Sequence, residues 1–584
     1  MSVRMLLSAL LMPLLGSAAA DLRWLPEHLR PDPFGGIVRA DGPGQARETR
    51  IELSGARDGY VSCHILVSPQ AGRQFTLTAE LQGLELELFR EWFHFMPSRK
   101  EWYPDALIPV RMPYSSVLPD PENKIENQRT QAFWLDIWIP KEAKPGVYDG
   151  KVVLRASGRT STLPLRIRVL SAIVPADDVV IPDHNSYGTF WLNAQYPKSE
   201  DLFRLIHAYH RIFYEHRGTF HQLGYGHGGK VAPEFAPELT GSGRTRRIKS
   251  WDLYDRHYGP LLDGTAFANT RRGPRPIPFV YLPINPEWPA SFLWWNEKGY
   301  ETEFVNVVRE MEQHFREKNW TQTRFELFFN HKKRYKAFPW DGDETRFPED
   351  NRYFVEYGRL MKKAIPADSP VKWVFRTDTS WTMAQQFKEL EGVINFWVAG
   401  SGMLSLYDWA PKLIRSRGEI LWTYGSPPRV NDNSAAITSE LLKAWLYGAS
   451  GFVHWLAVSP GDDPWFQFTG GATALVYPGT RFGINEPIPG IRLKIQRNCV
   501  QDLNLLEAVK DRVDREELTR LYNGTKPNDW WTRNSPLLNR PPQDWNNADI
   551  GDALKDHRKV QRPKDASAWQ RVREYVLKIA GGEA

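Results

Sequence analysis

Hydrophobic and polar residues alternate in short runs along residues 21–175. The clearest runs, rich in β-branched and aromatic residues, lie at 75–81, 133–139, 151–155 and 163–169. A period of two is typical of strands that bury one face. Residue pairs with turn chemistry occur among them, namely Pro145-Gly146, Asp149-Gly150 and Ser157-Gly158. We therefore predict an N-terminal β-sandwich domain over residues 21–175, ending in a linker at 175–178.

The pattern changes over residues 176–510, where short apolar runs alternate with longer amphipathic segments. The runs that predict strands are 277–282, 325–329, 372–375, 393–398, 419–424 and 451–455. The segments that predict helices are 202–213, 303–318, 353–363, 381–390 and 441–447. Repeated βα units over ~330 residues predict an α/β catalytic domain of the (β/α)8 TIM-barrel type. A doubly wound sheet is the alternative, but no Gly-rich phosphate turn follows an early strand.

The two ends of the chain differ from these domains. Arg4, an apolar core at 5–15 and the small residues Ala18–Ala20 predict a secretory signal peptide over residues 1–20. No later run approaches the ~20 apolar residues of a membrane span, so we expect a soluble periplasmic or secreted protein without membrane insertion. Residues 511–584 form a polar C-terminal extension with one predicted helix at 566–579, which could return to the barrel.

Composition narrows the function only slightly. The surplus of 75 basic over 69 acidic residues is small and evenly spread, so it does not indicate nucleic-acid binding. The 24 Trp, 22 Tyr and 29 Phe residues suit large cores, and they also suit an exported protein that stacks rings on sugars. Cys63 and Cys499 fall in different predicted domains, and we expect two buried thiols rather than a disulfide.

Polar and aromatic residues gather where the predicted strands end. Active sites of such barrels lie at the carboxyl ends of the strands, so these residues are the candidates for substrate binding. The candidate substrate-binding residues are Asn330, His331, Trp340, Arg376, Asp378, Trp397, Trp422, Tyr424 and Trp455. Of these residues, four could form a sugar platform or could be barrel core, namely Trp397, Trp422, Tyr424 and Trp455. Three histidines, His184, His331 and His454, do not share metal-ligand spacing, and we predict neither a metal site nor a cofactor.

The adjacent acids Asp343 and Glu344 are the candidate catalytic residues. Two neighbouring carboxyl groups repel, which tends to raise one pKa and leave the other group ionised. Cleavage of a glycosidic bond needs one carboxyl as acid and a second negative group for the oxocarbenium-like state. The alternative is a solvated acidic loop, or the acidic first turn of the helix predicted at 353–363.

Motifs along most of the mature chain resemble one family. They are residues 133–140 and 144–150 in the predicted sandwich, and 475–479, 486–493 and 498–506 near the end of the predicted barrel. In this order they resemble glycoside hydrolase family 123 and its uncharacterised relatives. The resemblance implies substrate-assisted hydrolysis of β-N-acetylgalactosaminides. Asp343 would orient the 2-acetamido group, whose carbonyl oxygen attacks the anomeric carbon, and Glu344 would protonate the leaving oxygen.

Two features depart from the family pattern. Thr345 follows the acid pair where the family usually has Pro, and the preceding loop with Lys332, Lys333 and Arg334 is unusually basic. Basic residues there could bind a uronate, sulfate or phosphate substituent. If the sugar lacks an acetamido group, Asp378 or Asp408 would be needed as nucleophile or base.

These observations predict an exported glycoside hydrolase that acts on a glycan or oligosaccharide with β-linked sugars, possibly amino sugars. The alternatives are a carbohydrate-binding protein without catalysis, and another carbohydrate-active enzyme such as a lyase or endo-hydrolase on an acidic glycan. The sequence leaves open the sugar, the linkage, exo or endo action and the oligomeric state.

Overall fold

The structure is a computed structural model that describes most of the chain. It covers residues 21–523 and 565–581, apart from gaps at 198, 291–295, 336–337, 380–382, 408, 426, 460–462, 467 and 469–471. The predicted signal peptide at 1–20 and the candidate Asp408 lie outside the described residues. Within the described ranges no helix is both long and apolar enough to cross a membrane.

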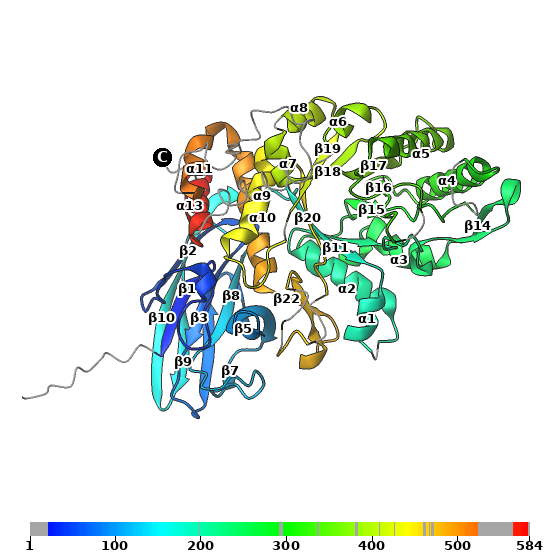
Figure 1. The fold of residues 1–584 in the computed structure, drawn as a ribbon. Helices are drawn as coiled ribbons and strands as arrows, with labels where there is room; N and C mark the ends of the chain where they lie inside the picture. The colour runs from blue at the N-terminus through cyan, green and yellow to red at the C-terminus, as the bar shows by residue number, and fades with distance from the viewer. Residues whose placement is uncertain are drawn as a thin grey trace, which may run out of the picture.

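The N-terminal part is a sandwich of two five-stranded sheets (Figure 1). The first sheet contains, in spatial order, β1 (Leu22–Pro26), β3 (Gly59–Val67), β8 (Gln131–Ile139), β5 (Glu85–Met96) and β6 (Glu101–Val110). The second contains β2 (Ile51–Arg57), β10 (Arg159–Ile173), β9 (Gly146–Ala156), β4 (Phe75–Leu81) and β7 (Tyr114–Ser116). Neighbouring strands are antiparallel except β2 and β10, which are parallel.

The turn predicted at Asp149-Gly150 is wrong, because both residues lie inside β9. Gly150 pairs with Leu81 and Leu165 on either side, and a Cβ on it would lie 2.2 Å from the Glu80 carbonyl oxygen. The glycine therefore permits a close approach of two strands. Ser157-Gly158 does form the turn between β9 and β10, with φ of 52° and 75°.

Strand β8 serves both domains through its alternation. Leu135 and Ile137 face the sandwich core, whereas Trp134 packs with Ile491 and Ile495 of the barrel domain. The even-numbered face thus carries the docking surface for the second domain.

Eight parallel strands form the barrel sheet. Their spatial order is β12 (Thr219–Leu223), β11 (Ile181–Tyr187), β20 (Gly451–His454), β19 (Ile420–Tyr424), β18 (Phe396–Gly400), β17 (Lys372–Thr379), β16 (Arg324–Leu327) and β15 (Phe279–Tyr281). The first and last strands of this order lie beside each other, so the sheet nearly closes. The predicted TIM-barrel fold behind a β-sandwich is confirmed.

Helices surround the barrel sheet (Figure 1). Those of the barrel domain are α1 (Phe190–Gln195), α2 (Leu202–Glu215), α3 (Asp252–Leu262), α4 (Tyr300–Glu317), α5 (Asn351–Ala364), α6 (Gln386–Glu389), α7 (Ser401–Leu406), α8 (Trp409–Ser416), α9 (Ala435–Tyr447) and α10 (Ile491–Ala508). Two small hairpin pairs, β13 (Glu238–Thr240) with β14 (Arg247–Ser250) and β21 (Val476–Pro478) with β22 (Pro487–Pro489), lie outside the barrel sheet.

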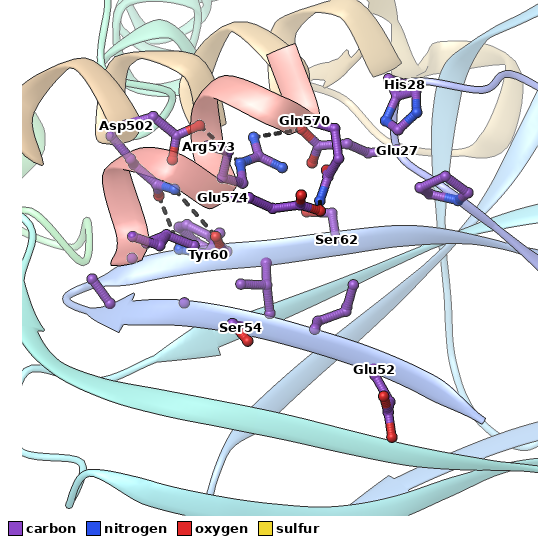
Figure 2. A pocket seen from close by; sticks show the side chains of 18 of the residues that line it. Glu27, His28, Glu52, Ser54, Tyr60, Ser62, Asp502, Gln570, Arg573 and Glu574 are labelled. Carbon is purple, nitrogen blue, oxygen red and sulfur yellow. Dashed lines mark hydrogen bonds and ion pairs between the residues drawn. The ribbon is translucent and has the colours of Figure 1, made fainter. Parts of the chain in front are cut away.

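The tail returns to the body of the protein through α11 (Arg515–Asn523) and α13 (Ala568–Ala580). Arg573 of α13 is mostly buried and donates to Asp502 of α10 at 2.8 Å and to Glu27, just after β1, at 2.6 Å. Figure 2 shows these groups around a cavity of about 210 Å³ between α13 and the strands β2 and β3. The last helix therefore fastens the sandwich to the barrel domain.

The two cysteines are both buried and unpaired, as expected. Burial raises the pKa of the Cys63 thiol, so it stays protonated at neutral pH.

Candidate active site

The acid pair lies on a loop that returns to the carboxyl-terminal edge of the barrel. Thr345, the next residue, forms a parallel bridge with Thr379, the last residue of β17. Gly342 donates its N–H to the His331 carbonyl at 2.9 Å, and a Cβ on Gly342 would lie 2.5 Å from the Phe329 side chain. Backbone pairing and a close approach that only glycine allows thus place the acids at the strand ends.

Asp343 is buried and lies between two nitrogen groups. Its Oδ2 is 2.9 Å from Lys332 Nζ and 3.3 Å from His227 Nε2. Burial alone would raise the pKa of Asp343, but the hydrogen bond from His227 and the Lys332 ammonium outweigh it and hold the pKa below the ordinary value. Asp343 is therefore an ionised carboxylate at neutral pH.

Glu344 points to the open side of the same loop, with 37% of its side chain exposed. Its Oε2 accepts from Lys332 Nζ at 3.1 Å and its Oε1 accepts from the Tyr424 hydroxyl at 3.0 Å. Its backbone has a φ of 48°, a left-handed conformation that is uncommon for residues other than glycine. Lys332 therefore bridges the two acids, and Tyr424 fixes the second one from the opposite wall.

A third carboxyl group, that of Asp378 near the end of β17, lies close enough to Asp343 and Glu344 to interact with their charges. Arg376 holds it by two bonds of 2.7 and 3.1 Å. Burial raises the pKa of Asp378 to about 6 against the effect of Arg376, and the negative charges of Asp343 and Glu344 add to the rise. One group of this cluster thus takes up a proton near neutral pH.

Below the acids, the inward side chains form a buried charged layer. His221 of β12 lies 2.9 Å from both Asp183 of β11 and Glu326 of β16, and Arg376 reaches Glu326 at 3.3 Å. Burial disfavours charge on His221, but the two carboxylates outweigh it and raise its pKa to about 9. The imidazolium and Arg376 are therefore paired with three buried acids, Asp183, Glu326 and Asp378, beneath the mouth of the barrel.

Aromatic rings line the rim beside Asp343. Trp455, 36% exposed, meets Tyr187 edge to face at 4.9 Å, and Tyr187 lies 6.0 Å from the ring of His227. Tyr335, 54% exposed, stacks on His227 at 4.8 Å. Two exposed rings on either side of a partly buried pair offer flat apolar surfaces for a sugar next to the acids.

Comparisons with known proteins agree with this architecture. Residues 104–156 match the sequence profile of the glycoside hydrolase 123 N-terminal domain. The structure of a family 123 glycoside hydrolase from Clostridium perfringens, which concerns glycolipid glycan hydrolysis, covers 96% of this chain and 97% of its own. Its TM-score is 0.64 at 11% identity. A segment of the N-terminal domain thus matches the glycoside hydrolase 123 profile, and the whole chain shares the fold of the Clostridium perfringens enzyme.

Other comparisons are weaker. The two-module structure of a xylanase 10B from Clostridium thermocellum has a TM-score of 0.33 and 10% identity, over 83% of this chain and 93% of that one. A TM-score this low does not establish a common fold. None of the curated proteins matches the chain.

Several of the predicted site residues are not at the mouth of the barrel. Trp340 is fully buried and stacks on Tyr353 at 4.9 Å, and buried His331 packs on Trp340 at 4.4 Å. Trp397 faces the outer helices, where its indole donates to Glu419 at 2.7 Å. Trp422 fills the barrel interior against Phe279 and Phe396. These four side chains are core residues and not a sugar platform, because close packing leaves no face for a ligand.

The remaining candidates surround the acids. Tyr424 contacts Glu344, Arg376 and Asp378 form the buried pair, and Trp455 lies on the rim. Asn330 is buried beneath the loop, where its backbone N–H donates to Tyr225 at 3.3 Å.

The structure adds three residues that are not among the predicted site residues. His227, Tyr187 and Tyr335 come from three loops or strands and meet around Asp343. Lys332 and Lys333 were predicted to bind an anionic substituent of the sugar, but both form ion pairs within the protein. Lys332 pairs with Asp343 at 2.9 Å, and Lys333 pairs with Asp350 at 3.2 Å. Within the described part of the chain, no group of three His, Cys, Asp or Glu side chains could hold a metal ion.

Proposed function

We propose that this protein is an exported glycoside hydrolase of the family 123 type that cleaves β-linked N-acetylhexosaminides by a substrate-assisted mechanism. One observation carries the proposal: Asp343 and Glu344 project side by side at the carboxyl-terminal edge of the barrel and share Lys332. Export is supported by the pattern of Arg4, the apolar residues 5–15 and Ala18–Ala20.

Asp343 is suited to orient the 2-acetamido group. Its pKa is depressed, so it is an acceptor throughout the neutral range. Among the described residues its two contacts both use Oδ2. Oδ1 can then accept the acetamido N–H and direct the acetamido carbonyl oxygen toward the anomeric carbon. The oxygen attacks this carbon and the bond to the leaving group breaks.

Glu344 is suited to deliver the proton to the leaving oxygen. It is the more exposed acid, and both of its oxygens are held, one by Lys332 and one by Tyr424. To carry a proton for the leaving oxygen, the Glu344 carboxyl must lose its hydrogen bond from either Lys332 or Tyr424 as the glycan enters. After bond cleavage, the same two donors stabilise the carboxylate that remains. Water then opens the cyclised acetamido intermediate, with Glu344 as base.

Asp378 supports a second candidate for sugars without an acetamido group. Its pKa of about 6 and its place beside both acids suit a base or nucleophile at neutral pH. The first mechanism requires a 2-acetamido group on the substrate, whereas the mechanism through Asp378 does not.

The test is a glycan and aryl-glycoside screen with product analysis by mass spectrometry, on the wild type and on Asp343→Asn. We expect cleavage of β-N-acetylhexosaminides, little cleavage of matched sugars without the acetamido group, and a loss of about 10²–10³ in kcat/KM for Asp343→Asn. Equal cleavage of both sugar classes would favour the mechanism through Asp378. Binding without any product, or unsaturated products that absorb in the ultraviolet, would reject hydrolysis in favour of a binding protein or a lyase.

A further inference from the structure

A second cavity lies at the opposite end of the barrel, where the sandwich meets it. Its volume is about 500 Å³, within the range of small-ligand sites. Its walls come from β5, the end of α2, residues 269–271, β22 and α10. Figure 1 shows β22 between β5 of the sandwich and α2 of the barrel domain. His216, in its wall, precedes the first residue of β12, so the cavity faces the amino-terminal edge of the strands and not the acid pair.

One wall of the cavity carries two cationic side chains that share one buried carboxylate. Lys494 Nζ and Arg497 both bind a single buried carboxylate, Asp136 of β8, at 2.7 Å. Lys494 is nearly inaccessible, and its ammonium lies 4.2 Å from the centroid of the Phe89 ring. Within the described part of the chain, the Lys494 ammonium uses one of its three N–H groups to donate to Asp136. The other two can donate into the cavity.

His216 presents the complementary group. Its side chain is more than nine-tenths buried, and its Nδ1 lies 2.6 Å from the Ile212 carbonyl oxygen, which can only accept. Nδ1 therefore carries the proton, and in the neutral ring Nε2 is an acceptor. Burial, together with Lys494 and Arg497, holds the pKa of His216 well below its ordinary value, so the ring is neutral. Nε2 has no hydrogen-bond partner among the described residues.

The rest of the lining is apolar inside and charged at the rim. Phe89, Pro487 and Pro489 supply flat carbon surfaces. The rim groups Arg211 and Arg271 are paired with Glu486 and Glu87 at 3.4 and 3.5 Å. A bare anion could not satisfy His216 Nε2, because this nitrogen accepts a hydrogen bond and an anion without a proton has none to donate. A hydroxyl group donates and accepts at once, and apolar faces next to such groups are what a pyranose ring requires.

We propose that this cavity is a second carbohydrate-binding site, which takes one pyranose unit through hydroxyls that donate to His216 Nε2 and accept from Lys494 Nζ. The site is independent of the chemistry at the barrel mouth. It would hold a glycan on the enzyme at a distance from the cleaved bond, which raises the local concentration of chains for the acids.

The test is crystals of the full chain soaked in methyl β-D-galactopyranoside or methyl β-D-glucopyranoside, with saturation-transfer NMR of the same sugars. We expect a sugar in the cavity with one hydroxyl on His216 Nε2. His216→Leu should weaken this binding about tenfold, and His216→Gln, which restores an acceptor oxygen, should recover most of it. A cavity that holds only water, with sugar at the barrel mouth alone, would overturn the proposal.

A blocking variant keeps the test independent of the buried histidine. Glu215, the last residue of α2, lines the cavity, and Glu215→Trp should fill its mouth and abolish the saturation transfer that arises from it. Glu317→Trp, at the last residue of α4, is the matched control and should change nothing. Turnover of a small aryl glycoside should be equal in both variants. Unchanged sugar binding in folded Glu215→Trp would contradict the proposal.

Discussion

Glu344 occupies a backbone conformation that costs about 1–3 kcal/mol for a residue with a side chain. Its φ of 48° persists because the bridge between Thr345 and Thr379 fixes the following residue and Tyr424 holds the carboxylate. Strain of this kind is retained where the surroundings fix a group in one orientation. The conformation turns Glu344 toward the opening while Asp343 stays buried, so two neighbours in sequence acquire different environments.

Lys332 is expected to set the acid limit of activity. Together with His227 it holds the pKa of Asp343 low against burial. In Lys332→Met the pKa of Asp343 rises, so the acid limb of the pH profile of kcat/KM should move up by about one unit. Lys332→Arg keeps the charge and should leave the limb near its wild-type position. An unmoved limb in folded Lys332→Met would show that Lys332 does not control Asp343.

Asp378 should be visible as an ionisation near pH 6. Its pKa is raised to about 6, in part by Asp343 and Glu344, so the ionisation belongs to the group of carboxyls as a whole. The pH profile of kcat/KM should bend near 6 in the wild type and in the control Asp368→Asn, whose carboxyl is exposed. Asp378→Asn should lose that bend. A bend that survives in Asp378→Asn would assign it to another group.

Among the secondary-structure elements, six of the eight barrel strands could be predicted from the hydrophobic pattern, but β11 and β12 could not. Their sequences carry Asp183, His184, Asn185, His221 and Gln222, all buried. The barrel interior here is a paired charged layer, so the strands that build it do not alternate between apolar and polar residues. Hydrophobic periodicity predicts strands that face an apolar core, but it does not predict strands that face a buried network of ion pairs.

The close contact between β19 and β20 gives a test at this scale. A Cβ on Gly451 would lie 2.5 Å from the Trp422 indole, which is packed on every side in the barrel interior. Gly451→Ala should therefore lower the free energy of unfolding by about 1–3 kcal/mol, measured by urea denaturation. Gly259→Ala is the control, because its Cβ meets only Trp320, at 3.9 Å, and lies in helix α3. It should be neutral or stabilising. Equal stability of the two variants would contradict this packing.

At the scale of the whole molecule, long-range pairing decides what sequence alone could not. The acid pair was recognisable because its members are adjacent, whereas His227 is 116 residues from Asp343. Tyr424 is 80 residues from Glu344. Nothing in local composition singles out His227, and Tyr424 was predicted as a site residue only from its place at a strand end. The two domains are likewise joined by pairs such as Arg492 with Asp105, 387 residues apart and both fully buried.

The charged layer inside the barrel makes stability depend on pH. The pKa of His221 is raised from 6.5 to about 9 by Asp183 and Glu326, so the folded state binds this proton more tightly than the unfolded state. The stabilisation, on the order of 3 kcal/mol, is complete below pH 6.5 and is lost as pH rises through about 9. Between pH 6 and pH 10 the wild type should lose more free energy of unfolding than His221→Gln by about this amount. Parallel curves for the two proteins would reject the role of the imidazolium.

The most direct test of the account is the turnover of an aryl β-N-acetylhexosaminide by Glu344→Gln. The variant keeps a side chain of the same size, and its free energy of unfolding should stay within about 1 kcal/mol of the wild-type value, since Glu344 is partly exposed. We predict a fall in kcat of at least about 10³-fold with unchanged substrate binding, because the proton for the leaving oxygen is missing. Full turnover by Glu344→Gln would contradict the assignment of the acid and with it the proposed mechanism.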